Sequence, residues 1–107
     1  MILKLINHSE EYAVREIAAS FFPKTKFEFS DDTSNGDYII SEYAFSEGVH
    51  TYSAYASIGG KYSKASFDES YYNKTLIKKS VAHILEEITG IHLPWGVLTG
   101  IRPSKIL

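Results

Sequence analysis

Two closely spaced turn signals, Glu47-Gly48 and Gly59-Gly60, most constrain what this chain can fold into. Both glycines of the second signal can take the positive φ angles that a type I′ turn requires, and the flanking runs are rich in strand-forming residues. A two-residue loop also fixes which residues face each other across the hairpin. The sequence therefore predicts three antiparallel strands with these cross-strand neighbours: Tyr43 opposite Tyr52, Ser41 opposite Ala54, Ile39 opposite Ala56, Tyr52 opposite Phe67, Ala54 opposite Ala65 and Ala56 opposite Ser63.

This register gives the two faces of the predicted sheet different characters. Small residues occupy the middle of one face and Tyr43, Tyr52 and Phe67 lie toward one end of it, a shape that lets a helix approach closely. The other face is predicted to be solvated, because it carries a polar set: Glu42, Ser53, Ser57, Lys64 and Ser66.

The segment before the hairpins is predicted to contain a strand, a helix and a second strand. Residues 2–6 form a short apolar run with Leu3 and Leu5 on one face. A helix follows, capped by Asn7 or Ser9 and closed before Pro23, with its apolar positions at helical spacing: Val14, Ile17, Ala18 and Phe21. Residues 26–29 alternate as a strand does, and residues 30–36 are a polar turn.

The segment after the hairpins is predicted to be the longest helix. Asp68 or Ser70 is the expected N-cap and Gly90 the expected C-cap, around this apolar stripe: Ile77, Val81, Ile84, Leu85 and Ile88. The fold class is then α+β, a mainly antiparallel sheet of about five strands with two helices on one face. The element order is β-α-β-β-β-β-α, with a single domain over residues 1–92 and a connector over residues 93–107.

The composition of the chain limits the number of domains and the kinds of binding and metal sites that we expect. The 107 residues allow one domain, and a net charge of −2 argues against a nucleic-acid binder, because such domains usually carry a basic excess. There is no Cys, which excludes disulfides, thiolate metal sites and iron–sulfur ligation by this chain. No apolar run approaches the ~18 residues of a membrane helix. We therefore expect a cytoplasmic protein without a membrane partner.

No catalytic or metal-binding constellation stands out. The four histidines have no ligand spacing that suggests a metal site, and no Ser, His and Asp lie in the context of a nucleophile elbow: the histidines are His8, His50, His83 and His92. His83 lies at the edge of the helix stripe, where an interfacial or solvent-facing ring is expected. One binding alternative is open: Tyr55 and Tyr62 could stack on bases while Lys61 and Lys64 contact phosphates, although strand propensity alone explains the many tyrosines.

The C-terminal run Leu93-Pro94-Trp95-Gly96-Val97-Leu98-Thr99-Gly100-Ile101-Arg102-Pro103-Ser104-Lys105 is predicted to be a shaped connector. Its two prolines and two glycines cannot continue one regular helix. Trp95 is expected to anchor the connector on the last helix, while Arg102 offers a planar fork for a carboxylate or phosphate and Lys105 a point charge. Because the apolar pair Ile106-Leu107 has nothing after it to bury against, we expect the chain to continue in a longer protein.

This connector, following a helix that ends Glu86-Glu87-Ile88-Thr89-Gly90, resembles the segment before the catalytic domain of HemZ-type oxygen-independent coproporphyrinogen III oxidases (coproporphyrinogen dehydrogenases) of Firmicutes. The P-W-G-x-L-T-G-x-R-P pattern carries the resemblance, with Ser104 where Thr is expected. The opening strand and the helix ending Phe21-Phe22-Pro23 are also similar to that family's N-terminus. The resemblance is close in the connector and loose elsewhere.

The resemblance implies an N-terminal accessory domain of a radical S-adenosylmethionine enzyme, one that oxidatively decarboxylates two propionates of coproporphyrinogen III to vinyl groups. An iron–sulfur cluster and S-adenosylmethionine are then expected in the full-length parent and neither in this chain, because the family's C-x-x-x-C-x-x-C has no counterpart here. The implied partners are the downstream radical domain and the porphyrinogen substrate. The contact residues toward that domain or an anion are Trp95, Thr99, Arg102 and Lys105. The alternative is a nucleic-acid or protein interaction module that uses the Tyr-bearing sheet.

Overall fold

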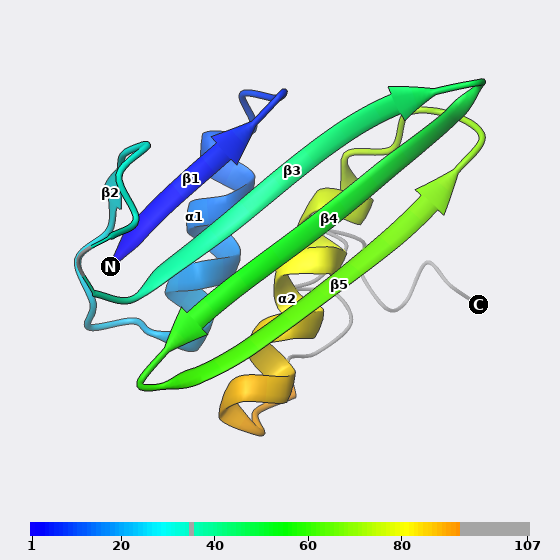
Figure 1. Ribbon diagram of the computed structural model, residues 1–107. Coiled ribbons are helices and arrows are strands. Elements are labelled where there is room, and N and C mark those ends of the chain that lie inside the picture. Colours follow the sequence, from blue (N-terminus) through cyan, green and yellow to red (C-terminus); the bar gives the residue numbers. More distant parts are fainter. Residues whose placement is uncertain (35, 93–107) are drawn as a thin grey trace.

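A five-stranded mixed sheet with both helices on one of its faces forms the protein (Figure 1). The computed structural model describes residues 1–34 and 36–92. The elements in chain order are β1 (Ile2–Ile6), α1 (Glu11–Phe21), β2 (Glu28–Phe29), β3 (Tyr38–Ser46), β4 (Val49–Ile58), β5 (Lys61–Glu69) and α2 (Thr75–Thr89). The predicted α+β class and the predicted order of elements are confirmed. The predicted connector over residues 93–107 lies outside the described residues.

The strands lie in the order β2-β1-β3-β4-β5. The three long strands are antiparallel, and all six predicted cross-strand neighbours are confirmed, from Ile39 opposite Ala56 to Tyr52 opposite Phe67. Gly59 and Gly60 both have positive φ angles, as the predicted turn requires. The first strand runs in the same direction as both of its neighbours, because β1 pairs in parallel with β2 and with β3. A parallel pair needs a crossover, and α1 supplies it between β1 and β2.

The core lies between the sheet and the helix pair. Ala54 and Ala56 are fully buried in the middle of β4, where their small side chains let α2 pack closely over β4 and β5. The predicted apolar positions of both helices are all buried, and α1 packs against α2 and over β1. Polar groups occur in this core only with partners: among the described residues, every buried side-chain nitrogen or oxygen has a hydrogen bond.

The predicted N-caps of both helices are wrong. At α1 the N-cap position is Glu10, and Asn7 instead adopts a left-handed conformation with φ of 62°. At α2 the strand β5 continues through Asp68, and the Thr75 N–H donates to Asn73 Oδ1 at 3.0 Å. The predicted C-cap is confirmed: Gly90 has a φ of 74° and its N–H donates to the Glu86 carbonyl at 2.8 Å. Pairing with a neighbouring strand therefore outweighed the local capping signal at Asp68.

The predicted strand over residues 26–29 is shorter than expected. Only Glu28 and Phe29 pair with β1, at Ile2 and Leu3, and they form the edge strand β2. Phe29 packs against the core while Glu28 is exposed. The strand therefore keeps the predicted alternation over two residues only.

Candidate functional site

The contact residues predicted within the connector are Trp95, Thr99, Arg102 and Lys105. All four lie outside the described residues. A candidate site must therefore be sought on the surfaces of residues 1–34 and 36–92. Two such surfaces stand out: the sheet face opposite the helices, and the end of the β3–β4 hairpin.

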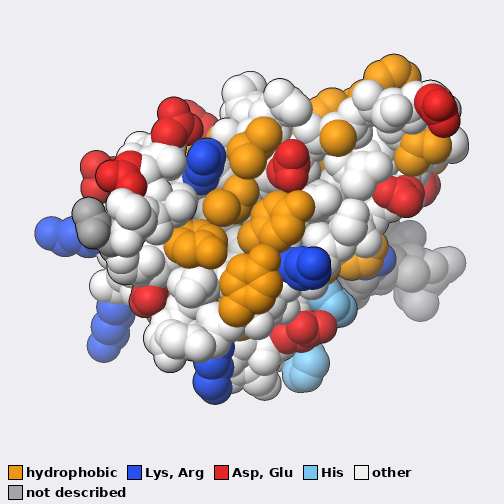
Figure 2. Space-filling view, viewed as in Figure 1, with side chains coloured by type: hydrophobic (Ala, Val, Ile, Leu, Met, Phe, Trp, Pro, Cys, Tyr) orange, Lys and Arg blue, Asp and Glu red, His pale blue; other side chains and the backbone are white. Residues whose placement is uncertain are grey.

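The sheet face that neither α1 nor α2 covers carries apolar side chains among polar ones. In Figure 1 both helices lie behind the sheet, and Figure 2, viewed from the same side, shows hydrophobic side chains gathered in the middle of this face. The strand register gives two adjacent rows on it: Lys4, Ile40, Tyr55 and Lys64, then Ile2, Tyr38, Ser57 and Tyr62. We call these eight residues the open-face platform. The predicted polar residues do lie on this face, and the platform adds five apolar or aromatic side chains among them: Ile2, Tyr38, Ile40, Tyr55 and Tyr62.

Tyr55 lies near the centre of the platform. Its hydroxyl donates to Glu42 Oε1 at 3.3 Å, and burial, followed by the Glu42 charge, raises the pKa of the phenol above its usual value. Tyr55 is therefore neutral at physiological pH and available as a ring to stack on. Beside it lies a pocket of about 330 Å³ lined by Ser53, Tyr55, Lys64, Ala65 and Ser66. A planar group over the ring with an anion at Lys64 would suit this arrangement chemically.

The structure brings together only part of the predicted stacking set. Tyr55, Tyr62 and Lys64 share the platform, and Tyr62 is 59% exposed. Lys61 does not share it, because it pairs with Ile58 on the alternating positions of the helix-side face. Sequence reasoning missed Lys4, which extends the row at its other end. The signal was present, since Lys4 alternates with Leu3 and Leu5 along the first strand.

The second surface is the end of the β3–β4 hairpin, which extends beyond α2 at the upper right of Figure 1. Aromatic rings form its base. The Tyr43 hydroxyl lies 2.6 Å from His50 Nδ1, and Tyr72, from the loop before α2, packs edge-on against Tyr43 with ring centroids 5.5 Å apart. The Phe45 ring lies 4.6 Å from the His50 ring. The loop thus closes over part of the hairpin and leaves Phe45 at its margin.

His8 and His50 serve as hydrogen-bonding groups within the fold. His8 Nε2 lies 3.0 Å from Ser41 Oγ on β3, and His8 Nδ1 accepts the Glu10 backbone N–H at 3.1 Å. Burial lowers the pKa of His8, so its ring is neutral at pH 7. The neutral ring thus links the segment after β1 to β3 and to the start of α1.

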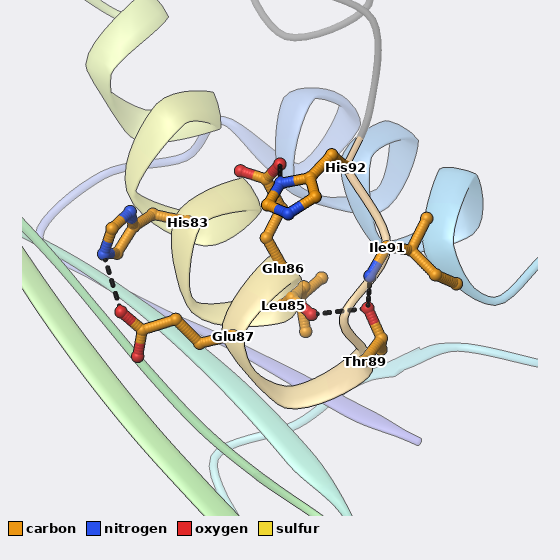
Figure 3. Close-up of polar contacts among 7 residues, drawn as sticks. All are labelled: His83, Leu85, Glu86, Glu87, Thr89, Ile91 and His92. Atoms are coloured by element: carbon orange, nitrogen blue, oxygen red, sulfur yellow. Dashed lines mark hydrogen bonds and ion pairs between the residues drawn. The ribbon is translucent and has the colours of Figure 1, made fainter.

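His83 lies in the middle of α2 and His92 just beyond its C-terminal end, each beside a carboxylate (Figure 3). His83 Nε2 is 2.9 Å from Glu87 Oε1, whose other oxygen accepts a hydrogen bond from Ser63 of β5, and His92 Nδ1 is 2.8 Å from Glu86 Oε2. In Figure 3 the two pairs point away from each other on the helix. Over residues 1–34 and 36–92, His, Cys, Asp and Glu form no group of three that could hold a metal ion.

The side chains on these two surfaces can bind by stacking, ion pairing and hydrogen bonding. Rings, lysines and carboxylates are present, arranged on a rigid sheet. No helix in the described part of the chain is long and apolar enough to cross a membrane. Comparison with protein-family models, with curated proteins and with solved structures found no match to this chain.

Proposed function

We propose that this chain is the noncatalytic N-terminal accessory domain of a radical S-adenosylmethionine enzyme of the HemZ-type coproporphyrinogen dehydrogenase kind. The single observation that carries the proposal is the connector Pro94-Trp95-Gly96 to Arg102-Pro103, whose pattern resembles the segment before that family's catalytic domain. A cytoplasmic location belongs to the same proposal. The iron–sulfur cluster, S-adenosylmethionine and the porphyrinogen would bind in the downstream domain of the parent.

Two features of the described residues support this role. The helix before the connector ends at Gly90 in a closed C-cap, and the described residues pack a core of their own between the sheet and both helices. The surfaces described above offer binding groups rather than a nucleophile with its base. A domain of this kind would contribute a packing surface, and would help to shape or cover the entrance to the catalytic domain.

The coding sequence downstream of residue 107 tests the proposal. We expect a Cys-x-x-x-Cys-x-x-Cys motif within roughly the next hundred residues, about one domain length. A downstream sequence without that motif would refute the proposal.

A narrower part of the proposal concerns Arg102 and Lys105. A guanidinium forms paired hydrogen bonds with a carboxylate, so Arg102 or Lys105 would pair with a substrate propionate or with an acidic residue of the catalytic barrel. In the full-length enzyme, Arg102→Ala would then reduce turnover or thermal stability. Unchanged turnover together with unchanged thermal stability would rule this pairing out.

A second candidate function is an interaction module that binds single-stranded nucleic acid on the open-face platform. The row that places Tyr55 between Ile40 and Lys64, with Lys4 beyond, favours it, because ring stacking beside lysines is how such surfaces hold bases and phosphates. Titration of fluorescently labelled oligouridine should then show binding that weakens steeply with added salt. Tyr55→Ala should abolish it, while Tyr12→Ala, a change on exposed α1, should not. No binding to wild-type protein would eliminate this candidate.

A further inference from the structure

The exposed apolar side chains of this protein are concentrated at one end. Seven large apolar or aromatic side chains are well exposed in the described part of the chain, and four of them come from the β3–β4 hairpin end and the loop after β5. These four are Phe45 at 60%, Val49 at 41%, Tyr71 at 58% and Tyr72 at 48% exposure. Phe45 lies on the helix side of the hairpin end and Val49 on its open side, so apolar groups flank the turn on both faces. Exposed apolar groups gathered at one end of a soluble protein mark a contact surface.

The same end is acidic. Segments 43–52 and 65–73 contain Glu47, Asp68 and Glu69 and no Lys or Arg. The carboxylate of Glu10 also lies near this end, since it adds to burial in raising the pKa of Tyr72. Figure 2 shows acidic and hydrophobic side chains together at the upper right. We define the acidic-aromatic tip as these residues: Phe45, Glu47, Val49, Glu69, Tyr71 and Tyr72.

The tip is held rigid before any contact is made. Ser46 pairs with Val49 across the turn, and His50 pairs with Glu69 on β5, so both segments are fixed to the sheet. The packing of Tyr72 on Tyr43 then fixes the loop. Rigid aromatic groups cost little conformational entropy when they become buried, which is why such residues dominate the energetics of interfaces.

We infer that the acidic-aromatic tip docks on a basic, partly apolar surface of the downstream domain of the same protein, an inference that rests on the proposed function. The negative charge of the tip indicates what kind of surface it would contact. When the rings become buried on docking, the carboxylates around them need Arg or Lys on the opposite surface, and Arg also stacks on aromatic rings. The size decides the partner. Complexes between separate proteins usually need about 800 Å² from each side, more than a few side chains supply, whereas a tethered domain docks at a high effective concentration.

Hydrogen exchange in the full-length protein tests this docking. In the full-length protein, amides of segments 43–52 and 65–73 should exchange about tenfold more slowly than in the chain of residues 1–107. The reason is that the docked domains must separate before the hairpin end can open locally. In the full-length protein, Phe45→Ser with Tyr71→Ser should return these amides to the rates of the shorter chain, because both side chains are exposed in the domain itself, and Glu47→Lys with Glu69→Lys should do the same. Tyr62→Ser, on the open-face platform, is the matched control and should leave the protection unchanged.

Three other results would each contradict the proposed docking. Equal exchange of the tip segments in both proteins would do so, as would protection confined to the open-face platform or protection that survives both double variants. The coding sequence distinguishes a failure of the docking from a failure of the proposed function. If the protein continues beyond residue 107 with the cysteine motif and the tip still exchanges freely, only the docking is wrong; if no downstream domain exists, both are wrong.

Discussion

The hydroxyl of Tyr52, at the buried centre of β4, accepts the backbone N–H of Asn73 at 2.6 Å. Asn73 in turn accepts the N–H of Thr75 through its side chain and so begins α2. One phenol thus ties the middle strand to the start of the helix that covers it. The Tyr52 ring is fully buried, and its contact with Asn73 sets where α2 starts on the sheet.

Tyr52→Phe should therefore destabilise the protein by about 1–2 kcal/mol, because it leaves the Asn73 N–H without its partner while the ring volume is kept. Urea unfolding followed by circular dichroism measures the change. Tyr62→Phe is the matched control, since Tyr62 is 59% exposed, and it should have almost no effect. Equal stability of Tyr52→Phe and wild-type protein would show that water replaces the contact.

Ala54→Leu should cost about 1–3 kcal/mol of unfolding free energy, because the added methyl groups would have to fit between β4 and α2 in a close-packed core. Ser57→Leu adds similar bulk on the opposite face of the same strand and should cost much less. Thermal unfolding of the two variants measures the difference. Similar losses in both would contradict the close approach of α2 to the small residues of β4.

Stability should decrease as the pH falls below about 6.5. Burial lowers the pKa of folded His8 below its ordinary value of 6.5, so between these two pKa values the unfolded chain binds a proton that the folded protein does not. The contribution of His8 is complete above pH 6.5 and is lost as the pH falls toward the folded pKa. Urea unfolding between pH 7.5 and 5 should show a shallower decline for His8→Gln, which cannot titrate, and an identical decline would contradict the assignment.

Gly90→Ala should cost about 1–2 kcal/mol, because Gly90 closes α2 at a φ of 74° where an L-residue is strained. Gly90→Asn should cost less, since Asn tolerates this conformation better. Figure 3 shows the neighbouring closure, in which Thr89 Oγ1 donates to the Leu85 carbonyl and accepts the Ile91 N–H. Chemical denaturation of both variants checks the order, and equal costs would argue against backbone strain as the cause.

The register of the long strands was predictable because two-residue loops leave no freedom in pairing. The direction of β1 was not, since parallel pairing with β3 depends on where the α1 crossover returns the chain. The predicted N-caps failed for a related reason: several polar residues compete near each helix start, and contacts with Tyr52 and Ser41 decide among them.

The two surfaces differ in how far the sequence could reveal them. Simple alternation along β1 and β3 places Lys4, Tyr38 and Ile40 on one face of each strand, but the position of Lys4 beside Ile40 depends on the parallel pairing of β1 with β3. The acidic-aromatic tip was not, because it depends on Tyr72 folding back onto Tyr43, a contact between residues 29 positions apart that no local pattern encodes. The resemblance of the connector concerns residues beyond 92 and was independent of both.

Iron and acid-labile sulfide analysis of the full-length protein, after anaerobic reconstitution, tests the central claim most directly. If this chain is the accessory domain of a radical S-adenosylmethionine enzyme, the full-length protein will hold an iron–sulfur cluster in its downstream domain, and the chain of residues 1–107, which has no Cys, will hold none. A full-length protein that takes up no cluster under these conditions would contradict the proposal.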